Sequence, residues 1–534
     1  MMLRNQQVAQ LARDDFDVLI VGGGINGAVS AAALAARGVK VGLIDARDFA
    51  GFTSQHSSNL VWGGIKYMEG YEFGLVAGLC KSRNELLDSF PSTVREIRFL
   101  MTLNRQFRFH PWVIFASTWL YWLLGRGRTR IPHLLSLKKI RKAEPRIDVD
   151  AAIAGVEYSD AFLHDNDARF VFNFVRSAMD KGCVAANYVA AESAGRDAGG
   201  DWVTQAVDQV SGERIEIRSK VMINATGAYV DSLNDACGIT TEYCHLLSKG
   251  IHLIVPRISD ADRVLAFFAD DERLFFAIPM ANRTCIGTTD THVDDPETAV
   301  TEADREFVLS NINARLDLSK PLTRDDVISE RCGVRPLAIK RSAAIATDVK
   351  QLSRKHIVET SAAERHVSIF GGKLTDCLNV GEEICDEVQR LGIALGPAER
   401  WYGEPDQARR DAFFRRVRAL GLDVSIAADT SETLGSRLWR RYAENAHAML
   451  DAIERDPDQA EPIIDEAGIR RCELSYLAEH EMIVTLDDYL RRRSKLALLM
   501  PHEELRHSEG LKEVCRNLFG DDAEARIDEY FNQA

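Results

Sequence analysis

DVLIVGGGINGAVSAAALAARGVKVGLID, residues 17–45, is the stretch that decides the fold. It begins with a short apolar strand and continues with a helix of small residues from Ile25 to Arg37. A second apolar strand, KVGLID at residues 40–45, follows the helix. This order predicts a strand–helix–strand opening, and therefore an α/β unit at the start of the chain.

The glycines of this stretch have a spacing with a known mechanism. Gly22, Gly24 and Gly27 form G-x-G-x-x-G directly after the strand, and Asp45 ends the second strand. The first glycine permits a tight turn, the second lets the backbone approach a pyrophosphate, and the third lets helix pack on strand. The acid accepts a hydrogen bond from a ribose hydroxyl. A glycine turn alone is weak evidence, but strand, helix and acid at these offsets predict a dinucleotide site.

A second segment of similar type is VMINATGAYVDSL, residues 221–233, in which Ala225, Thr226 and Gly227 lead from a strand into a helix. It is similar to the stretch with which many flavoproteins close over the adenine side of their nucleotide. Together with the N-terminal position of the first motif, it favours FAD over NAD and adds Gly227 to the predicted cofactor contacts. An ordinary strand-to-helix turn is the alternative interpretation.

Length and composition limit the class of protein. The 534 residues exceed what one hydrophobic core usually supports, so two or three structural units are expected. The formal charge of −14 argues against a nucleic-acid partner, which needs net attraction to phosphates. The ten cysteines show no C-x-x-C pair, which predicts free thiols and no metal site. Without a signal peptide or eighteen consecutive apolar residues, the chain is expected in the cytoplasm.

The composition and the hydrophobic pattern of the sequence change near residue 396. Mixed strands and helices are expected up to about 395, with apolar strands at 220–225, 252–255 and 284–288. The tail is charged and strongly helical, with segments such as RRDAFFRRVRAL, LWRRYAENAHAMLDAIERD and LDDYLRRRSKLALLM. We predict one domain at 16–395, with nucleotide-binding and substrate-binding parts interleaved, and a helical domain at 396–534. The tail either mediates a homodimer or packs against the main domain.

Further motifs follow in a fixed order along the chain. They are VGGGINGA, TSQHSSNLVWGGIKYMEGYEFGLV, VEYSDAFLHDNDARFVF, NATGAYV, KGIHLIVP, IGTTDT, GVRPL, FGGKLT and EHEMIVTLDDYLRRRSK. With them the chain resembles the FAD-dependent glycerol-3-phosphate dehydrogenases, including the bacterial respiratory enzyme, over almost its whole length. The resemblance implies a Rossmann-like FAD-binding domain of the D-amino-acid-oxidase type, a mixed-sheet substrate domain and a C-terminal all-helical domain.

The resemblance also implies a reaction. It is the oxidation of sn-glycerol 3-phosphate to dihydroxyacetone phosphate by hydride transfer to FAD, with electrons passed to a membrane quinone. A dehydrogenase of another phosphorylated polyol and an oxygen-using oxidase of the same superfamily remain alternatives. A flavoprotein that only binds a membrane partner is disfavoured, because Arg335, Lys373 and His252 are retained.

The loop after the second strand is expected to serve both flavin and substrate. Family members commonly have Lys at the position of Asn59, His at that of Trp62 and Arg at that of Lys66. Lysine carries a point charge, whereas arginine is a bidentate donor. Of all that the resemblance implies, the identity of the substrate is therefore the inference that these departures weaken most. The residues that the resemblance transfers are Ser57 and Ser58 beside the flavin, and Gly63, Gly64, Lys66 and Tyr67 toward the substrate.

Two cations belong to the same expected site. GVRPL is predicted to place Arg335 in a loop at a strand end, and FGGKLT places Lys373 at the start of a helix. The turn that contains Gly372 and Thr375 would present the positive end of that helix to the anionic reduced flavin. Solvated surface charges are the alternative interpretation of both cations.

His252, in KGIHLIVP, matches the family's histidine near the reacting carbon. An imidazole can accept the hydroxyl proton, while Arg335, Lys66 and Lys373 are hypothesised to clamp the phosphate. A lone histidine in an apolar strand is otherwise a core residue. Asp290, in IGTTDT, is expected to hold a loop near the flavin or to stabilise a turn.

The most apolar segment is PWVIFASTWLYWLLG, residues 111–125, which is too short to span a bilayer. Interfacial aromatics and flanking arginines fit a monotopic anchor on anionic lipid, whereas a buried helix or a dimer contact is the alternative. The resemblance favours peripheral association with the inner face of the cell membrane. The residues concerned are Trp112, Trp119, Tyr121, Trp122, Arg105, Arg108, Arg126, Arg128 and Arg130.

Overall fold

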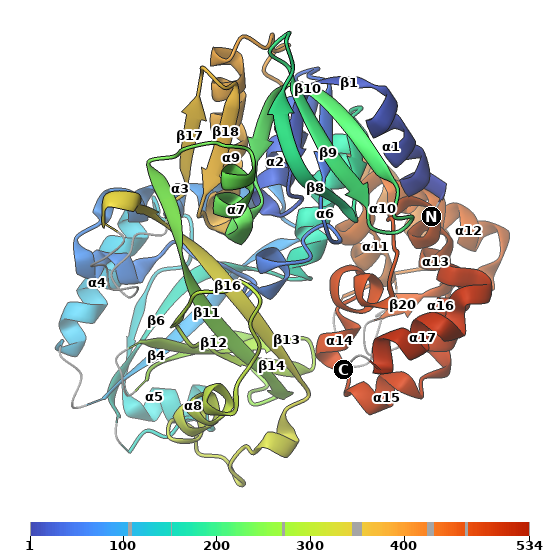
Figure 1. Ribbon diagram of the computed structural model, residues 1–534. Coiled ribbons are helices and arrows are strands. Elements are labelled where there is room, and N and C mark those ends of the chain that lie inside the picture. The colour runs from blue at the N-terminus through green and yellow to red at the C-terminus, as the bar shows by residue number, and fades with distance from the viewer. Residues whose placement is uncertain are drawn as a thin grey trace.

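Two large sheets and a group of C-terminal helices make up the molecule (Figure 1). The computed structural model describes residues 2–104, 109–150, 152–269, 273–343, 355–423, 432–464 and 468–532. Sheet A lies at the top of Figure 1, sheet B at the lower left and the helical C-terminal part at the right. The chain passes repeatedly between the two sheets, so each is built from segments far apart in sequence.

Sheet A contains the predicted nucleotide-binding strands. β1 (Asp15–Val21) and β2 (Val41–Ile44) run parallel and are connected by α2 (Ile25–Ala36), as the opening motif predicts. β10 (Arg214–Asn224) pairs in parallel with the other edge of β1, which brings the second nucleotide segment beside the first. The other strands of this sheet are β7 (Val184–Ala186), β8 (Val189–Arg196), β9 (Trp202–Asp208), β17 (Ile357–Ser361) and β18 (His366–Phe370).

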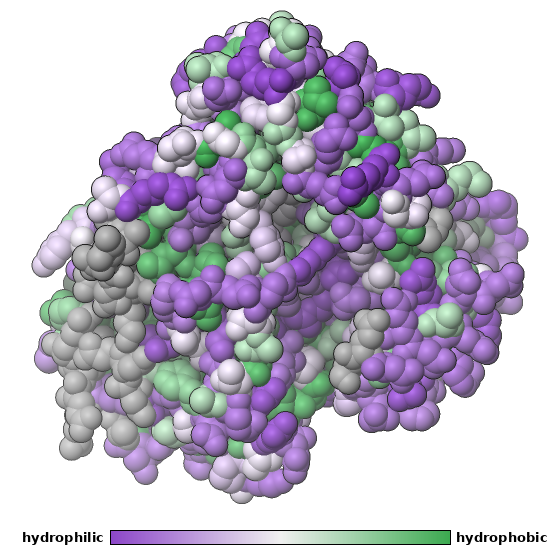
Figure 2. Space-filling view, in the orientation of Figure 1, coloured by the Kyte–Doolittle hydropathy of each residue, from purple (hydrophilic) through white to green (hydrophobic). Residues whose placement is uncertain are grey.

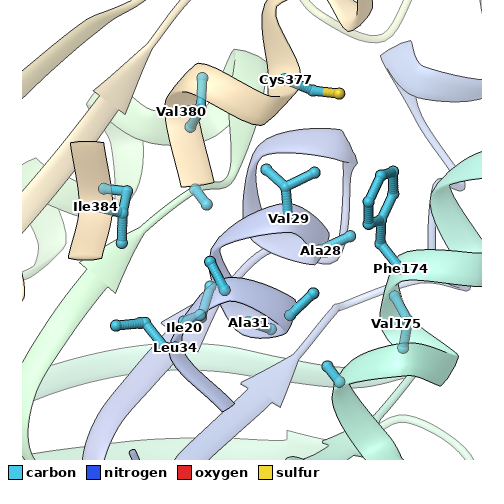
Figure 3. Close-up of a cluster of buried hydrophobic side chains, with 14 of the residues drawn as sticks. Ile20, Ala28, Val29, Ala31, Leu34, Phe174, Val175, Cys377, Val380 and Ile384 are labelled. Carbon is cyan, nitrogen blue, oxygen red and sulfur yellow. The ribbon is translucent and has the colours of Figure 1, made fainter. Parts of the chain in front are cut away.

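Small side chains on α2 allow two helices to pack closely against it. Figure 3 shows α2 between α6 (Asp167–Met179), which contributes Phe174, and α9 (Cys377–Arg390), which contributes Val380 and Ile384. Burial of each larger apolar side chain stabilises this core by about 1.5–3 kcal/mol. The packing fixes the position of α2 and α9, and both helices follow a predicted cofactor turn.

Sheet B holds β11 (Tyr243–Pro256) and β16 (Ser329–Lys340), which pair antiparallel along most of their length. Ile251 and Leu253 pack into a core cluster on one face of β11. Because side chains alternate across a strand, His252 faces the other side. The remaining strands of this sheet are β3 (Leu60–Val61), β4 (Val94–Asn104), β5 (His133–Leu135), β6 (Ala152–Leu163), β12 (Arg263–Phe268), β13 (Leu274–Met280), β14 (Arg283–Gly287) and β15 (Thr291–Val293).

The C-terminal part has a hydrophobic core of its own, formed by residues between Phe413 and Phe531. The helices expected at 438–456 and 486–500 are both interrupted, the second by a π-helix at Asp488–Arg493. A two-stranded ribbon also departs from an all-helical tail. The elements are α10 (Gln407–Ala419), α11 (Leu434–Tyr442), α12 (Ala446–Arg455), β19 (Pro462–Ile464), β20 (Ile469–Arg470), α13 (Arg471–His480), α14 (Leu496–Leu499), α15 (His502–Arg506), α16 (Glu509–Phe519) and α17 (Ala523–Asn532).

Buried ion pairs join the C-terminal part to the nucleotide-binding part. Arg493 Nη1 lies 2.8 Å and Arg492 Nε 2.6 Å from Asp48 Oδ2, in the loop after β2. Arg169 of α6 forms a two-pronged pair with Glu481, with Nη2 at 2.8 Å from Oε2. Burial alone would raise the pKa of Asp48, but the two arginines lower it below its usual value. These ion pairs are therefore closed to solvent.

Two helices lie outside this plan. α1 (Met2–Arg13) precedes β1, was not predicted from the sequence, and buries Arg4 against Asp208. α4 (Pro111–Leu124) contains the apolar segment and lies at the left edge of Figure 1. No helix among the described residues is long and apolar enough to cross a membrane. The other helices of the first 400 residues are α3 (Phe73–Ser89), α5 (Leu137–Ala143), α7 (Val230–Ala236) and α8 (Glu302–Asn313).

Candidate active site

The glycine turn between β1 and α2 has no room for side chains. Gly22 has φ +105°, and a Cβ there would lie 2.5 Å from the carbonyl oxygen of Ala225. A Cβ on Gly27 would lie 1.8 Å from the carbonyl oxygen of Gly22. Gly24 is the N-cap of α2 and supplies no side-chain cap, while the Ser54 hydroxyl accepts from the Ile25 N–H at 3.0 Å. The predicted glycines thus form a close cradle at the positive end of α2, with the Ser54 hydroxyl beside it.

Asp45 lies at the end of β2, directly beside this turn. Its Oδ2 accepts from the backbone N–H of Gly23 at 2.7 Å, and its Oδ1 from that of Arg47 at 2.8 Å. Burial raises the pKa of Asp45 to about 6. Gly227, with φ +61°, begins the short helix after β10, two residues beyond Ala225. The structure therefore brings Asp45 and the second nucleotide segment to the same end of sheet A.

The loop after β2 meets the turn before α9. The backbone N–H of Trp62 donates to Thr375 Oγ1 at 3.1 Å, and Lys373 Nζ lies 4.1 Å from the ring centroid of Tyr67. Lys373 also lies 5.5 Å from the ring of Trp62. Tyr67, Lys373 and Thr375, predicted from two separate motifs, are thus neighbours, and Lys66 precedes Tyr67 in the chain.

A buried network supports the Gly63–Gly64 step. Asp160 Oδ1 accepts from the N–H of Gly63 at 3.0 Å and from Arg83 Nη1 at 3.1 Å, while Tyr121 Oη donates to Asp160 Oδ2 at 2.6 Å. A Cβ on Gly63 would lie 2.2 Å from that hydroxyl. Gly64 has φ +78° and lies against the ring of Tyr67. The network explains the glycine at position 63, and the positive φ explains the one at 64; neither Asp160 nor Arg83 was predicted from the sequence.

Ser57 and Ser58 lie in the same loop, before Gly63. Ser57 donates to Asp167 Oδ2 through its backbone N–H at 2.9 Å and its hydroxyl at 2.8 Å. Ser58 is half-buried. Asn59 follows with φ +60°, and its Nδ2 donates to the carbonyl of Asp165 at 2.6 Å. The Ser57 hydroxyl is therefore occupied by a protein carboxylate.

His252 and Arg335 form a second group, on the site-facing side of sheet B. Arg335 was predicted in a loop at a strand end, but it lies within β16, opposite Ser248 of β11. The prediction failed because β11 is long enough to pair through this region. The Arg335 guanidinium lies over Gly250, where a Cβ would be 2.0 Å from Nη2.

Polar atoms of the loop after β14 surround the Arg335 guanidinium. Nη2 donates to Thr288 Oγ1 at 3.0 Å, and Nη1 to the carbonyl of Thr289 at 3.3 Å. Asp290 Oδ1 lies 3.6 Å from Nη1 and accepts from the Ser248 hydroxyl. Asp290 thus holds its loop and Arg335 in place.

His252 is a buried neutral imidazole. Burial, together with the charges of Arg331 and Arg335, lowers the pKa of His252 to about 3. Its Nδ1 is buried without a hydrogen-bond partner among the described residues. Gly287 of β14 lies opposite, and a Cβ there would be 2.7 Å from the imidazole. His252 is thus not a satisfied core histidine.

The two groups share one face of sheet B. The ring of Trp62 packs edge-on against Phe276, with centroids 6.3 Å apart. Phe276 lies opposite Gly287, and Gly287 opposite His252. Gly371, in the turn before Lys373, donates its N–H at 3.0 Å to Nε2 of His245, so this turn meets β11 near the start of the strand. Gly372, with φ +105°, lies against Asn26 of α2.

Four residues besides Asp160 and Arg83 were not predicted from the sequence: Asn26, His56, Arg331 and Arg491. Asn26 Nδ2 donates to the carbonyl of Gly371 at 3.1 Å and links the two cofactor turns. Arg331 lies opposite His252, and Arg491 Nη2 lies 3.2 Å from His56 Nδ1. Asn26 lies inside the G-x-G-x-x-G motif, which was a reason to consider it. No local pattern pointed to the contacts of Arg331, Arg491 and His56.

A cavity of about 340 Å³ lies on the outer side of the loop after β2. It is lined mainly by polar side chains, among them Arg47, Asp48, Tyr188 and Arg492, and His56 borders it. The hydrophilic recess at the centre of Figure 2 lies in the same part of the molecule, between the upper part and the helical part. None of the predicted catalytic residues lines this cavity.

The residues present fit FAD. A Cβ at Gly22 or Gly27 would fill the glycine cradle, and this close approach of backbone at the positive end of α2, beside the Ser54 hydroxyl, suits a pyrophosphate. Asp45 suits a ribose hydroxyl. The turn at 371–375, tied to Asn26 on one side and to Trp62 on the other, lies where the same ligand could reach it.

Comparisons with known proteins support an FAD-binding oxidoreductase fold over most of the chain. Residues 17–366 match the family described as FAD dependent oxidoreductase, and residues 408–526 match the C-terminal domain of alpha-glycerophosphate oxidase. A glycerol-3-phosphate dehydrogenase from Pseudomonas aeruginosa is 31% identical over 507 residues, covering 92% of this chain and 94% of that protein. The aerobic glycerol-3-phosphate dehydrogenase of Escherichia coli is 30% identical over 511 residues, covering 94% and 98%. A glycerol-3-phosphate dehydrogenase from Bacillus halodurans, solved with FAD, shares the fold with a TM-score of 0.74 at 24% identity, covering 99% and 96%.

Proposed function

The chain belongs to the FAD-dependent oxidoreductases, among the glycerol-3-phosphate dehydrogenases, and from this premise we propose that it oxidises the secondary hydroxyl of sn-glycerol 3-phosphate to the ketone of dihydroxyacetone phosphate. The observation that carries the proposal is the placement of His252 between cations on a face lined by glycines. A small anionic substrate fits such a face, because glycines leave space and arginines bind phosphate.

Substrate binding is assigned to three cations and one tyrosine. Arg335 is held by Thr288 and Thr289, so its guanidinium is oriented before a substrate arrives. Lys373 lies over Tyr67, which fixes the ammonium by a cation–π contact, and Lys66 is adjacent in sequence. These side chains would hold the phosphate and present the hydroxyl-bearing carbon to the ring system.

Proton removal is assigned to Nδ1 of His252. FAD, when bound, supplies the two-electron acceptor for the hydride that leaves the substrate carbon. His252 is neutral throughout the physiological range, because its pKa is lowered to about 3 by burial and by Arg331 and Arg335. A phosphate bound to Arg335 would cancel part of that charge and raise the basicity of His252 once the substrate is in place.

Membrane association and a quinone acceptor form a further part of the proposal. α4 exposes Trp112 and Leu123, with 61% and 60% of their surface accessible, and Val113 and Leu120 are also exposed. Only Pro111, Thr118 and Tyr121 of this helix are buried. Such a face favours an interfacial anchor over a buried helix, at the inner face of the cell membrane.

The arginines after α4 partly support contact with anionic lipid. Arg126, Arg128 and Arg130 are exposed, although Arg128 pairs with Asp88 and Arg130 with Glu96. Arg105 and Arg108 lie outside the described residues.

Another phosphorylated polyol is the second candidate substrate. Lys66 stands where family members commonly have arginine, so a point charge takes the place of a bidentate donor. Trp62 occupies the face of sheet B beside Phe276. Both changes alter the shape of the pocket around the substrate without removing its cations.

The test is anaerobic mixing of the purified holoenzyme with glycerol 3-phosphate while the flavin absorbance is recorded. Rapid bleaching is expected, and Arg335→Lys should raise the concentration for half-maximal bleaching about tenfold or more, because the bidentate fork is lost. Arg324→Lys, at an exposed arginine that pairs with Glu302 and precedes β16, serves as the matched control. A flavin that no polyol phosphate bleaches would contradict the proposal.

A further inference from the structure

Arg331 of β16 is a buried cation without an anionic partner. It is 0% exposed, and its Nη1 donates to the carbonyl of Ser57 and to Asn59 Oδ1 at 3.0 Å. Its Nε and Nη2 have no hydrogen-bond partner, and no carboxylate among the described residues forms an ion pair with it. A guanidinium buried in this way costs several kcal/mol unless an anion compensates it.

A second arginine reaches the same place from the helical part. Arg491 Nη2 lies 3.2 Å from His56 Nδ1, and its carbonyl accepts from Asn166 Nδ2 at 2.6 Å, which fixes the backbone. Burial, and then the charge of Arg331, lower the pKa of Arg491 to about 10. Arg491 likewise forms no ion pair within the described part of the chain.

The nearest carboxylates are already occupied. Asp167 and Asp487 both favour the charged form of Arg491. Asp167, however, accepts from the N–H and the hydroxyl of Ser57, and Asp487 accepts from Arg492 Nη1 at 2.6 Å. The hydrogen bonds from Ser57 do not cancel the charge of Asp167, but neither carboxylate forms an ion pair with Arg331 or Arg491 among the described residues.

The register of sheet B places Arg331 beside the proposed base. His252 lies directly opposite Arg331, which brings their Cβ atoms within about 4.5–5.5 Å of one another. Arg331, Gly333 and Arg335 lie on the same face of β16, because side chains alternate along a strand. A Cβ on Gly333 would lie 2.7 Å from His56 Cβ, so His56 fills the space over this glycine. His252 is consequently flanked by two guanidinium groups along one strand.

We propose that Arg331 and Arg491 form a second anion subsite, which binds an acidic group at the end of the substrate away from its phosphate. This proposal rests on the proposed function, in which Arg335 binds the phosphate and His252 faces the reacting carbon. The preferred substrate class is then a phosphorylated hydroxy acid rather than a neutral polyol phosphate. Arginine donors in a buried site discriminate strongly between a carboxylate and a neutral hydroxymethyl group.

The probes are glycerol 3-phosphate and both enantiomers of 3-phosphoglycerate, which has a carboxylate in place of the terminal hydroxymethyl group. Their dissociation constants are measured on the oxidised holoenzyme from the change in flavin absorbance, with phosphoglycolate as a ligand that cannot be oxidised to a ketone. One enantiomer of 3-phosphoglycerate should bind about tenfold or more tightly than glycerol 3-phosphate. Arg331→Gln should reduce this ratio about tenfold, whereas Arg331→Lys should retain part of it.

Arg141→Gln, which removes an exposed arginine on α5, controls for the change in net charge. If Arg331→Gln fails to fold with FAD, the ratio in the unmodified enzyme and in Arg491→Gln decides the matter. Equal or weaker binding of both enantiomers overturns the subsite, even when glycerol 3-phosphate bleaches the flavin. A shift of the flavin midpoint potential in Arg331→Gln without any change in the ratio overturns it too, since Arg331 would then serve the flavin. If no phosphorylated ligand perturbs the flavin, the proposed function fails as well.

Discussion

At the scale of single residues, the shape of the candidate site depends on glycines, which leave space, and on charged side chains that are held by polar partners. Gly22, Gly27, Gly250 and Gly287 are each required because a Cβ would collide with backbone, with Arg335 or with His252. The polar residues next to them are fixed by partners from other segments, such as Thr375 for the loop at Trp62. Two residue-scale predictions follow from charges rather than from space.

Asp45→Ala should weaken FAD binding by about 1.5–3 kcal/mol, because a carboxylate that accepts hydrogen bonds from the Gly23 N–H and from a ribose is lost. Equilibrium titration of the apoprotein with FAD, followed by fluorescence quenching, measures the change. Asp15→Ala removes an exposed carboxylate at the opposite end of β1 and should leave the affinity unaltered. Equal losses in both variants would show that the effect is one of general charge.

The surroundings of His356 predict that the folded protein loses stability at alkaline pH. Its Nδ1 lies 2.8 Å from Asp376 and its Nε2 2.8 Å from Glu383. Burial lowers the pKa of His356, but these two carboxylates raise it to about 9. Since the folded pKa is above the usual value of about 6.5, the stabilisation is complete below about pH 6.5 and is lost as the pH rises through about 9.

His356→Gln should therefore lower the free energy of unfolding by about 2 kcal/mol at pH 7, after allowance for solvent screening at the half-exposed Glu383. Thermal unfolding of both proteins between pH 6 and 10 provides the measurement. The two curves should converge above pH 9. A constant difference across this range would mean that His356 acts by packing and not by charge.

At the scale of elements, the sequence predicted those parts that depend on local pattern. The β1–α2–β2 unit and the turn at Gly371–Thr375 follow from strand pattern, glycine spacing and helix starts within short windows. The side of sheet B on which the His252 side chain lies follows from the alternation of side chains along one strand. Arg335 was placed in a loop because the length of the β11–β16 pair cannot be seen within a five-residue motif.

The remainder depends on contacts between distant segments. Arg331 and Asn59 are 272 residues apart, and Arg491 and His56 are 435 apart. No local period or spacing encodes such pairs, because they arise only when the sheets and the helical part close together. The breaks at residues 443–445 and 488–493 were missed for a related reason, since apolar periodicity continues across them.

α4 provides a prediction about an element as a whole. Trp112→Ser combined with Leu123→Ser should reduce binding to vesicles that contain anionic phospholipid by tenfold or more, because each exposed apolar side chain contributes about 1.5–3 kcal/mol when buried. Vesicle flotation measures the bound fraction. Ile153→Ser with Val210→Ser, two exposed apolar residues elsewhere, is the control pair. Unaltered flotation with a changed elution volume would instead identify α4 as a contact between copies of the chain.

At the scale of the whole molecule, the helical part contributes to the site instead of standing apart from it. We propose the division near residue 396, because the C-terminal part has its own core. Its π-helix nevertheless delivers Arg491 to His56, and Arg492 and Arg493 to Asp48. Asp48 and His56 belong to the loop that leads from β2 to Ser57, so loosening this interface should disturb the flavin side of the site.

Asp48→Asn tests this coupling. The side chain is 0% exposed and pairs with two arginines, so replacing it leaves Arg493 with Glu481 at 3.6 Å as its remaining anion and should destabilise the protein by about 3–5 kcal/mol. Urea unfolding measures the loss, and the rate of FAD release measures its effect on the site. Glu529→Gln removes an exposed pair on α17 and should cost less than about 1 kcal/mol without changing FAD release. If Asp48→Asn lowered stability but retained FAD as the unmodified protein does, the interface would only hold the two parts together; faster release would mean that the helical part positions the loop from Asp48 to Ser57.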